Sequence, residues 1–222
     1  MAGLQILRGI PAEMVDDAAR LIVDAFALKL EHEMRARTPE QARRLVAGGM
    51  DPDLGLVAVD PRAGVVGVLG VVLRGRRFVD MDLRMLTSEF GLLGAISRWA
   101  SAAAEHILTH PRKRQWRIQM LAVDGARRGE GIGTALLTTV IDAARQAGME
   151  TVGLEVVDVN ERALQLYRRL GFRCTFTLPT GRLTARSGFR GVRFMRLDCR
   201  VHLPERPSRD RRRRGGAGRI SH

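Results

Sequence analysis

The chain has 222 residues and a formal net charge of +13, with 37 Lys and Arg residues against 24 Asp and Glu residues. A hydrophobic fraction of 45% and a charged fraction of 27% are typical of a soluble globular protein. The longest apolar run, residues 63–73, is too short for a membrane-spanning helix, which needs about 20 residues.

The N-terminal residues lack the basic start and apolar core of a signal peptide. We therefore expect a cytoplasmic protein with no membrane partner. The two cysteines, Cys174 and Cys199, are then expected to be free thiols, because disulfides are rare in that compartment.

Positive charge gathers near the C-terminal end. Residues 206–222 hold seven Arg and one Asp, which accounts for +6 of the net charge. The segment has no apolar period, so we predict that residues 205–222 form a disordered, solvated tail. Clustered Arg can also bind nucleic-acid phosphates. No aromatic residue interrupts the cluster and no recognition helix is visible, so we do not expect nucleic acid as a partner.

The first elements are indicated by hydrophobic period and by capping residues. Residues 4–10 are typical of a strand, and residues 12–30 have apolar positions at helical spacing, with Pro11 expected at the first helical position. A second helix is predicted from Thr38, which with Gln41 three positions later resembles a capping box. We expect this helix to stop at the glycine pair of residues 48–49.

Strand and helix patterns then alternate along the chain. Residues 54–60 and 65–74 predict a β-hairpin, and residues 75–112 form a longer connection with a helical latter half. We expect that connection to shape the substrate site or an oligomer interface. The remaining strands are predicted at residues 115–123, 151–157, 172–178 and 191–201, and the remaining helices at 131–148 and 160–171. This order predicts an α/β fold, with a mixed central β-sheet and flanking helices in one domain.

Residues 128–134, "RGEGIGT", join a predicted strand to a predicted helix and carry a glycine at every second position. The first backbone N–H groups of a helix lack internal partners and, with the helix dipole, favour an anion. Glycine allows that backbone to approach phosphate oxygens, and Arg128 adds positive charge. The stretch therefore predicts a pyrophosphate site. It is neither a Rossmann fingerprint, which would need a glycine in place of Leu136, nor a P-loop.

A second motif, "NERALQLYRRLGF", follows at residues 160–172. Asn160 can cap a helix, and Ala163 and Tyr167 share one helix face because they are four positions apart. Tyr167 is the one tyrosine of the chain. Its phenol, with an ordinary pKa near 10, is either a proton donor or a core aromatic residue.

Together the two motifs resemble the GCN5-related N-acetyltransferase (GNAT) superfamily, whose members transfer an acyl group from acyl-CoA to an amine. The resemblance covers residues 115–176 and includes Arg128, Gly131 and Gly133 of the loop. It implies a GNAT domain over residues 1–204, with acyl-CoA in the splay between the fourth and fifth strands. It also implies acetyl-CoA as co-substrate, an amine acceptor and no metal. The identity of the acceptor and a homodimer are left open.

The resemblance assigns acetyl-CoA contacts to three groups of residues. The backbone of a strand pairs with the pantetheine arm through Leu121, Ala122 and Val123. The loop that wraps the pyrophosphate consists of Arg128, Gly129, Glu130, Gly131, Ile132, Gly133 and Thr134. The later helix, near the sulfur, contributes Asn160, Ala163 and Tyr167.

The family mechanism is direct attack of a neutral amine on the thioester. The resemblance gives Tyr167 the role of acid toward the leaving thiolate. Glu155 lies 12 residues before Tyr167, an offset similar to that of ribosomal-protein N-terminal acetyltransferases. It is a candidate base, beside a water chain; alternatively it only pairs with a nearby Arg. His106 and His110 are spaced four apart on a predicted helix but lack a third ligand, so we expect no metal.

Two other functions remain open from the sequence. One is a non-catalytic regulatory module that binds acyl-CoA and acylates nothing. The other is an acetyltransferase associated with RNA or the ribosome and tethered by the Arg-rich tail. Tyr167 and Glu155 favour an enzyme, because a binding module needs neither.

Overall fold

The computed structural model describes residues 3–34, 38–80, 84–88, 90–91, 114–180 and 188–200, with the side chains of residues 27–34 left out. The described strands form one sheet in the order β1-β2-β3-β5-β6-β8-β7, and β4 pairs with β3 beside this path. The strands are β1 Gln5–Arg8, β2 Gly55–Asp60, β3 Gly64–Leu73, β4 Arg76–Arg77, β5 Gln115–Val123, β6 Thr151–Val157, β7 Arg173–Pro179 and β8 Gly191–Asp198. Neighbouring strands are antiparallel except β5 and β6, which are parallel.

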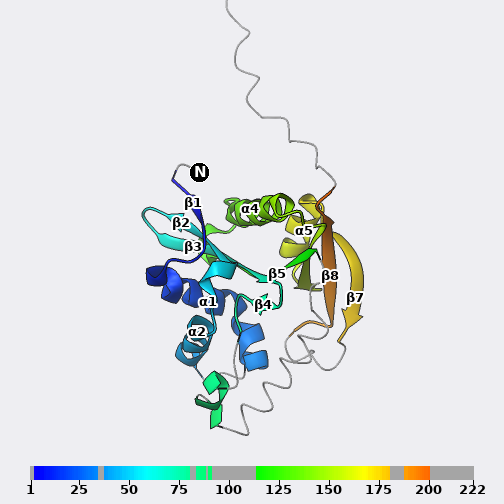
Figure 1. The fold of residues 1–222 in the computed structure, drawn as a ribbon. Coiled ribbons are helices and arrows are strands. Elements are labelled where there is room, and N and C mark those ends of the chain that lie inside the picture. Colours follow the sequence, from blue (N-terminus) through cyan, green and yellow to red (C-terminus); the bar gives the residue numbers. More distant parts are fainter. Residues whose placement is uncertain are drawn as a thin grey trace, which may run out of the picture.

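Helices cover both faces of the sheet. Figure 1 shows α1 (Val15–Met34) and α2 (Pro39–Gly48) on one side and α4 (Ile132–Gln146) with α5 (Glu161–Arg169) on the other. Three 3-10 turns accompany them: Ala12–Met14, Pro52–Leu54 and Gly125–Arg127. The mixed α/β architecture with a central sheet and flanking helices is confirmed.

Helix α4 packs on the sheet through the apolar stripe that the sequence predicts. Its buried residues are Ile132, Leu136, Leu137, Val140, Ile141 and Ala144. A glycine on β3 makes room for this helix, because a Cβ at Gly67 would lie 2.7 Å from Ile132 Cγ2 and 3.0 Å from Leu136 Cδ1. The start of α4 is therefore held close to the sheet.

The helix starts follow the predicted caps, with one difference. Thr38 Oγ1 accepts a hydrogen bond from the Gln41 backbone N–H at 3.1 Å, and Asn160 Oδ1 accepts one from the Ala163 N–H at 3.1 Å. The prediction for Pro11 is wrong: it precedes the first 3-10 turn with ψ 142°, so it lies outside the helical residues.

The glycine pair at the end of α2 is required for a different reason from the one that the sequence predicts. Gly49 has a φ of −89°, so it does not provide the left-handed stop that helix-closing glycines commonly supply. A Cβ at Gly49 would instead collide with the backbone oxygen of Asp80 and lie 3.1 Å from the Leu45 oxygen. Gly49 is needed for the close approach of two backbone segments.

Strand β5 contains a bulge at Gln119. Gly70 on β3 pairs with Met120, whereas Val71 pairs with Ile118, so Gln119 is an extra residue. Its side chain holds the backbone of Val79 from both sides: Oε1 accepts from the Val79 N–H at 3.1 Å, and Nε2 donates to the Val79 oxygen at 2.8 Å. Bulges bend a strand and increase its local twist, so β5 changes direction here.

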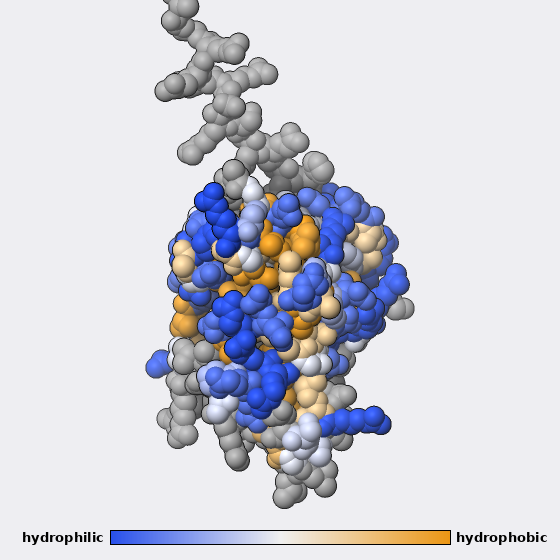
Figure 2. Space-filling view, turned by 90° about the vertical axis from the view of Figure 1, so that its left-hand side faces the viewer, coloured by the Kyte–Doolittle hydropathy of each residue, from blue (hydrophilic) through white to orange (hydrophobic). Residues whose placement is uncertain are grey.

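The surface carries both hydrophilic and apolar residues. In Figure 2, hydrophilic residues cover most of the face shown and apolar residues appear in a central band. In the part of the chain that the structure describes, no helix has the length and apolar character needed to cross a membrane. The tail of residues 205–222 and most of the predicted helix within residues 75–112 lie outside the described residues.

Candidate active site

A gap between β5 and β6 is the first component of the site. The two strands pair over three residues only, from Gln115 opposite Thr151 to Arg117 opposite Gly153. Beyond Arg117, where the bulge bends β5, no further β5–β6 pair is present among the described residues. These are the fourth and fifth strands of the sequence prediction, renumbered because of the short β4. Their predicted splay is observed.

The backbone of β5 presents free hydrogen-bonding groups to this gap. The Asp124 N–H donates to the Val66 oxygen at 3.0 Å, so the amide of residue 124 points toward β3. Backbone amides alternate sides along a strand. Those of Leu121 and Val123 therefore point away from β3, toward the gap. The intervening Ala122 pairs with β3 opposite Val68 and is buried, so it contributes packing at this position.

The loop after β5 ends at an uncapped helix start. Gly131 is the N-cap of α4, with a left-handed φ of 85° and no side-chain cap. Among the described residues, the backbone N–H groups of Ile132, Gly133 and Thr134 have no hydrogen-bond acceptor. By contrast, α2 and α5 have side-chain caps. Three free amides at the positive end of a 15-residue helix are able to bind an anion.

Two adjacent arginines in this loop have different environments. The Arg127 guanidinium bonds to Glu130 Oε2 at 2.7 Å and to Asp60 Oδ2 at 3.2 Å. Arg128 is exposed and has no ion pair among the described residues. The backbone N–H of Arg62 and the Arg127 guanidinium hold the pKa of Asp60 below its ordinary value. Arg127 therefore fastens the loop to the β2–β3 hairpin, and Arg128 remains available to a ligand.

Helix α5 closes the other side of the loop. Arg162 Nη2 lies 3.5 Å from the position that a Cβ of Gly129 would take, and Leu166 Cδ2 lies 3.4 Å from that of Gly133. Leu121 and Val123 of β5 also approach the Gly133 position, at 3.8 and 3.7 Å. The loop, the end of β5 and α5 thus meet at one place. Gly129, with a φ of 98°, is a turn position that favours glycine.

Asn160 and Ala163 lie at the start of α5. Because Asn160 Oδ1 is engaged by the Ala163 N–H, the group that Asn160 can offer to a ligand is its side-chain NH₂. Ala163 is half-buried, and it places Tyr167 one turn further along the same helix face.

Tyr167 is buried on α5, with 7% of its surface exposed. Its ring meets Phe172 edge to face, with ring centroids 5.8 Å apart. Burial raises the pKa of the phenol from 10.0 to about 12, because the charged phenolate loses its hydration in the core. The phenol therefore stays protonated at neutral pH, which a proton donor requires, and it is also a core aromatic residue.

The raised pKa of Tyr167 predicts how the stability and the tyrosinate absorbance of the protein change at alkaline pH. Tyr167 is the one tyrosine, so tyrosinate absorbance reports on it alone. The folded chain holds the proton more tightly than the unfolded chain, whose pKa is near 10. The resulting stabilisation is fully present below pH 10 and is lost as the pH rises toward about 12. We expect little tyrosinate at pH 11 in native buffer and a midpoint near pH 10 in denaturant. A native midpoint at pH 10 would contradict burial of the hydroxyl.

Glu155 lies on β6, where the paired part of β5 and β6 ends. Its Oε1 accepts from Arg117 Nη1 at 2.7 Å, and the two side chains are 22% and 10% exposed. The sequence leaves two roles open for Glu155, and of these the pairing with a nearby arginine is observed. The other carboxylate oxygen has no partner among the described residues.

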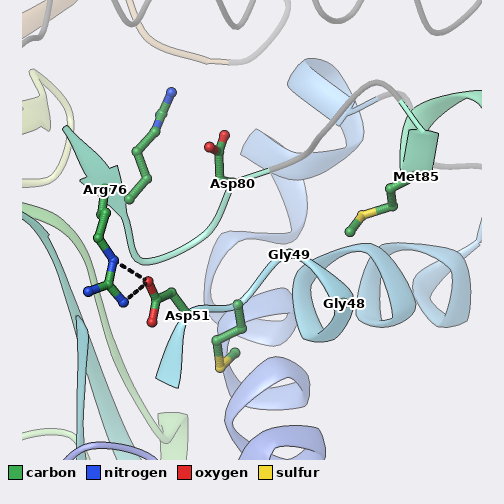
Figure 3. Close-up of a pocket in the computed structure, with 8 residues that line it drawn as sticks. Gly48, Gly49, Asp51, Arg76, Asp80 and Met85 are labelled. Carbon is green, nitrogen blue, oxygen red and sulfur yellow. Dashed lines mark hydrogen bonds and ion pairs between the residues drawn. The ribbon is translucent and has the colours of Figure 1, made fainter. Parts of the chain in front are cut away.

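A pocket of about 300 Å³ lies elsewhere, between the end of α2 and β4. Figure 3 shows the Arg76 guanidinium bonded to Asp51 Oδ2, at 2.6 and 3.1 Å, with Met85 on the opposite side and Asp80 in between. The pocket contains none of the predicted site residues. It lies at the end of β3 that pairs with the first residues of β5, with β3 between the pocket and β5, and thus away from the loop at residues 128–134.

Metal ligation finds no support in the described residues, where no group of three or more His, Cys, Asp or Glu side chains lies close enough to hold an ion. His106 and His110 lie outside the described residues. Sequence reasoning missed four residues that shape the site: Asp60, Arg127, Gln119 and Arg162. Arg162 could have been found, because it lies two positions after the predicted cap Asn160, which places it in the first turn of α5.

Comparisons with known proteins agree with this geometry. The family described as "Acetyltransferase (GNAT) family" matches residues 90–172, which include the loop, β6 and α5. Human N-acetyltransferase 8B is 40% identical over 113 residues, covering 45% of this chain and 50% of that protein. Mycothiol acetyltransferase of Propionibacterium freudenreichii is 29% identical over 164 residues, covering 73% of this chain and 42% of that protein. The chain thus spans half or less of these relatives.

Solved structures support the fold. A GCN5-related N-acetyltransferase from Kribbella flavida superposes with a TM-score of 0.57 at 22% identity, covering 88% of this chain and 98% of that chain. The ribosomal-protein-S18-alanine N-acetyltransferase of Escherichia coli gives a TM-score of 0.52 at 15% identity, covering 92% and 99%. Residues 90–172 thus match the GNAT family, and the chain shares the fold of solved GNAT structures over most of its length.

Proposed function

We propose that this protein transfers an acetyl group from acetyl-CoA to an amine. The observation that supports this most directly is that backbone N–H groups without a partner among the described residues follow one another from β5 to the start of α4. Leu121 and Val123 present backbone groups to the gap, and the gap leads to the uncapped start of α4 beside Arg128. The pantetheine arm would lie along β5 as an added strand. The diphosphate would bind the helix amides and Arg128, and Arg162 is close enough to contribute.

The same residues can carry the reaction. A neutral amine attacks the thioester carbonyl, so that an N–C bond forms and the C–S bond breaks. A β5 amide facing the gap stabilises the oxyanion. Arg117 contacts Glu155 Oε1, which leaves the second oxygen to receive the amine proton, directly or through water. Tyr167 protonates the leaving thiolate, since its hydroxyl keeps its proton at neutral pH.

Calorimetric titration with acetyl-CoA tests the binding half of this proposal, and release of free CoA with an amine panel tests the catalytic half. Tyr167→Phe is expected to lower kcat by about 100-fold, because a positioned acid is lost. Acetyl-CoA affinity should remain within about twofold, since the apolar ring is kept.

The outcomes separate the candidate functions. Binding without CoA release on any amine would favour the regulatory acyl-CoA-binding module. Unchanged turnover of Tyr167→Phe would assign the thiolate proton to another donor. Absence of binding heat would contradict both the enzyme and the module. The relatives described above are an N-acetyltransferase and a mycothiol acetyltransferase, which supports acetyl as the acyl group.

A further inference from the structure

A row of arginines crosses the sheet on the face opposite α4 and α5. Arg173 on β7 pairs with Arg196 on β8, and Arg196 pairs with Gly153 on β6. Gly153 in turn pairs with Arg117 on β5. Residues directly opposite each other on neighbouring strands project from the same face. Three arginines from β7, β8 and β5 therefore lie in one line, with a glycine between the second and the third.

This row has far more positive charge than negative. Like charges directly opposite each other in a sheet are destabilising, yet Arg173 and Arg196 have no ion pair among the described residues. Arg117 has 8% of its surface exposed, and its buried Nε has no hydrogen-bond partner. Among the residues that the structure describes, Glu155 is the single carboxylate bonded to the row, through Arg117. Within the described part of the chain, the positive charge of Arg173 and Arg196 is not balanced by a bonded carboxylate.

The next row on the same face combines two phenylalanines with Glu155. Phe176 on β7 pairs with Phe194 on β8, and Phe194 pairs with Glu155 on β6. The two rings lie 5.8 Å apart, and 56% of the surface of Phe176 is exposed, which is high for a large apolar residue. The ring pair, Glu155 and the arginine row thus adjoin one another.

We propose that the acceptor is an amine that also carries a carboxylate, such as an amino acid with an apolar side chain. Its amine faces Glu155, its carboxylate binds Arg196 and Arg173, and its apolar part lies on the phenylalanine pair. Glu155 and Arg196 lie one strand apart and two residues along, about 8 Å between backbones. Long arginine side chains can span the remaining distance to one small molecule. This inference rests on the proposed acetyl transfer.

The test compares L-phenylalanine with L-phenylalaninamide, and L-leucine with its amide, as acceptors for acetyl-CoA with the full chain. We expect each acid to exceed its amide in kcat/KM by at least about tenfold. The α-amino group of each amide loses its proton more readily than that of the corresponding acid. Amine reactivity alone would therefore make the amides the better acceptors. Arg196→Gln and Arg173→Gln should each reduce the acid-to-amide ratio by about tenfold.

The matched control is Arg193→Gln. Arg193 lies on the same strand as Arg196 but projects from the opposite face, where it pairs with Val156, so the ratio should not change. A second readout needs no turnover: removing the like-charge contact by Arg173→Gln should raise the melting temperature of the ligand-free protein by about 1–2 °C. An unchanged melting temperature would contradict the inference that Arg173 and Arg196 face each other without a compensating anion.

The possible results distinguish the two proposals. If acetyl-CoA does not bind, the proposed function fails and this inference fails with it. If acetyl-CoA binds but the amides are acetylated faster, or neither acid is acetylated, only this inference is overturned. Succinyl-CoA tests the other possible source of the carboxylate, which is the acyl group of the donor. A preference for succinyl-CoA over acetyl-CoA that Arg196→Gln abolishes would place the anion on the acyl donor and overturn the assignment to the acceptor.

Discussion

Arg128→Glu is expected to weaken acetyl-CoA binding by about 10- to 100-fold while the protein stays folded. The effect is large because the substitution removes a charge-assisted contact to the diphosphate and adds a repulsive carboxylate at the start of α4. Stability should change by less than about 0.5 kcal/mol, since the Arg128 side chain is exposed and has no ion pair among the described residues. Calorimetric titration and thermal melting measure the two quantities.

The matched control is Arg8→Glu. Arg8 is an exposed residue at the end of the edge strand β1, so this change alters net charge by the same amount far from the loop. We expect its affinity for acetyl-CoA to stay within about twofold of the unaltered protein at physiological salt, where charges beyond about 8 Å are screened. Equal losses in both variants would show that net charge, and not the loop, determines the affinity.

Gly70→Ala is expected to give the largest loss of stability. A Cβ at Gly70 would overlap the ring of Phe78, which is fully buried. The ring has little freedom to move, because a Cβ at the facing Gly55 would also be only 2.7 Å from it. Overpacking of this kind costs about 2–3 kcal/mol. For a chain of this size, that lowers the melting temperature by about 6–10 °C.

Gly125→Ala serves as the control for Gly70→Ala. A Cβ at Gly125 would meet nothing within 4 Å, so its free energy of unfolding should change by less than about 0.5 kcal/mol. Chemical denaturation with a common slope would separate the two variants. Equal stability of the two would show that the Phe78 ring can be displaced at little cost.

Much of the fold could be predicted because local signals and packing agree. The stripe from Ile132 to Ala144 has the period of a helix, and it is the stripe that the sheet buries. Thr38 and Asn160 cap the helices that they precede. The glycine loop could be located because it combines two requirements, a left-handed turn at Gly131 and an open backbone.

Other features depend on contacts between distant segments, which a single sequence does not specify. The different environments of Arg127 and Arg128 arise from Asp60, which lies 67 residues before Arg127. The carboxylate of Glu155 is bonded to an arginine 38 residues away, so its partner could not be identified from spacing. Gly49 has the sequence context of a helix stop, but its small size serves a tertiary contact with Asp80.

The bulge at Gln119 has a consequence for how such a protein can arise or change. A regular β5 could pair with β6 along its whole length, and the amides of Leu121 and Val123 would then be satisfied within the sheet. One surplus residue leaves them free. Under the proposed function, the capacity to bind acetyl-CoA therefore depends in part on one extra residue in β5. A lineage could gain or lose it by an insertion or deletion that leaves both recognisable motifs intact.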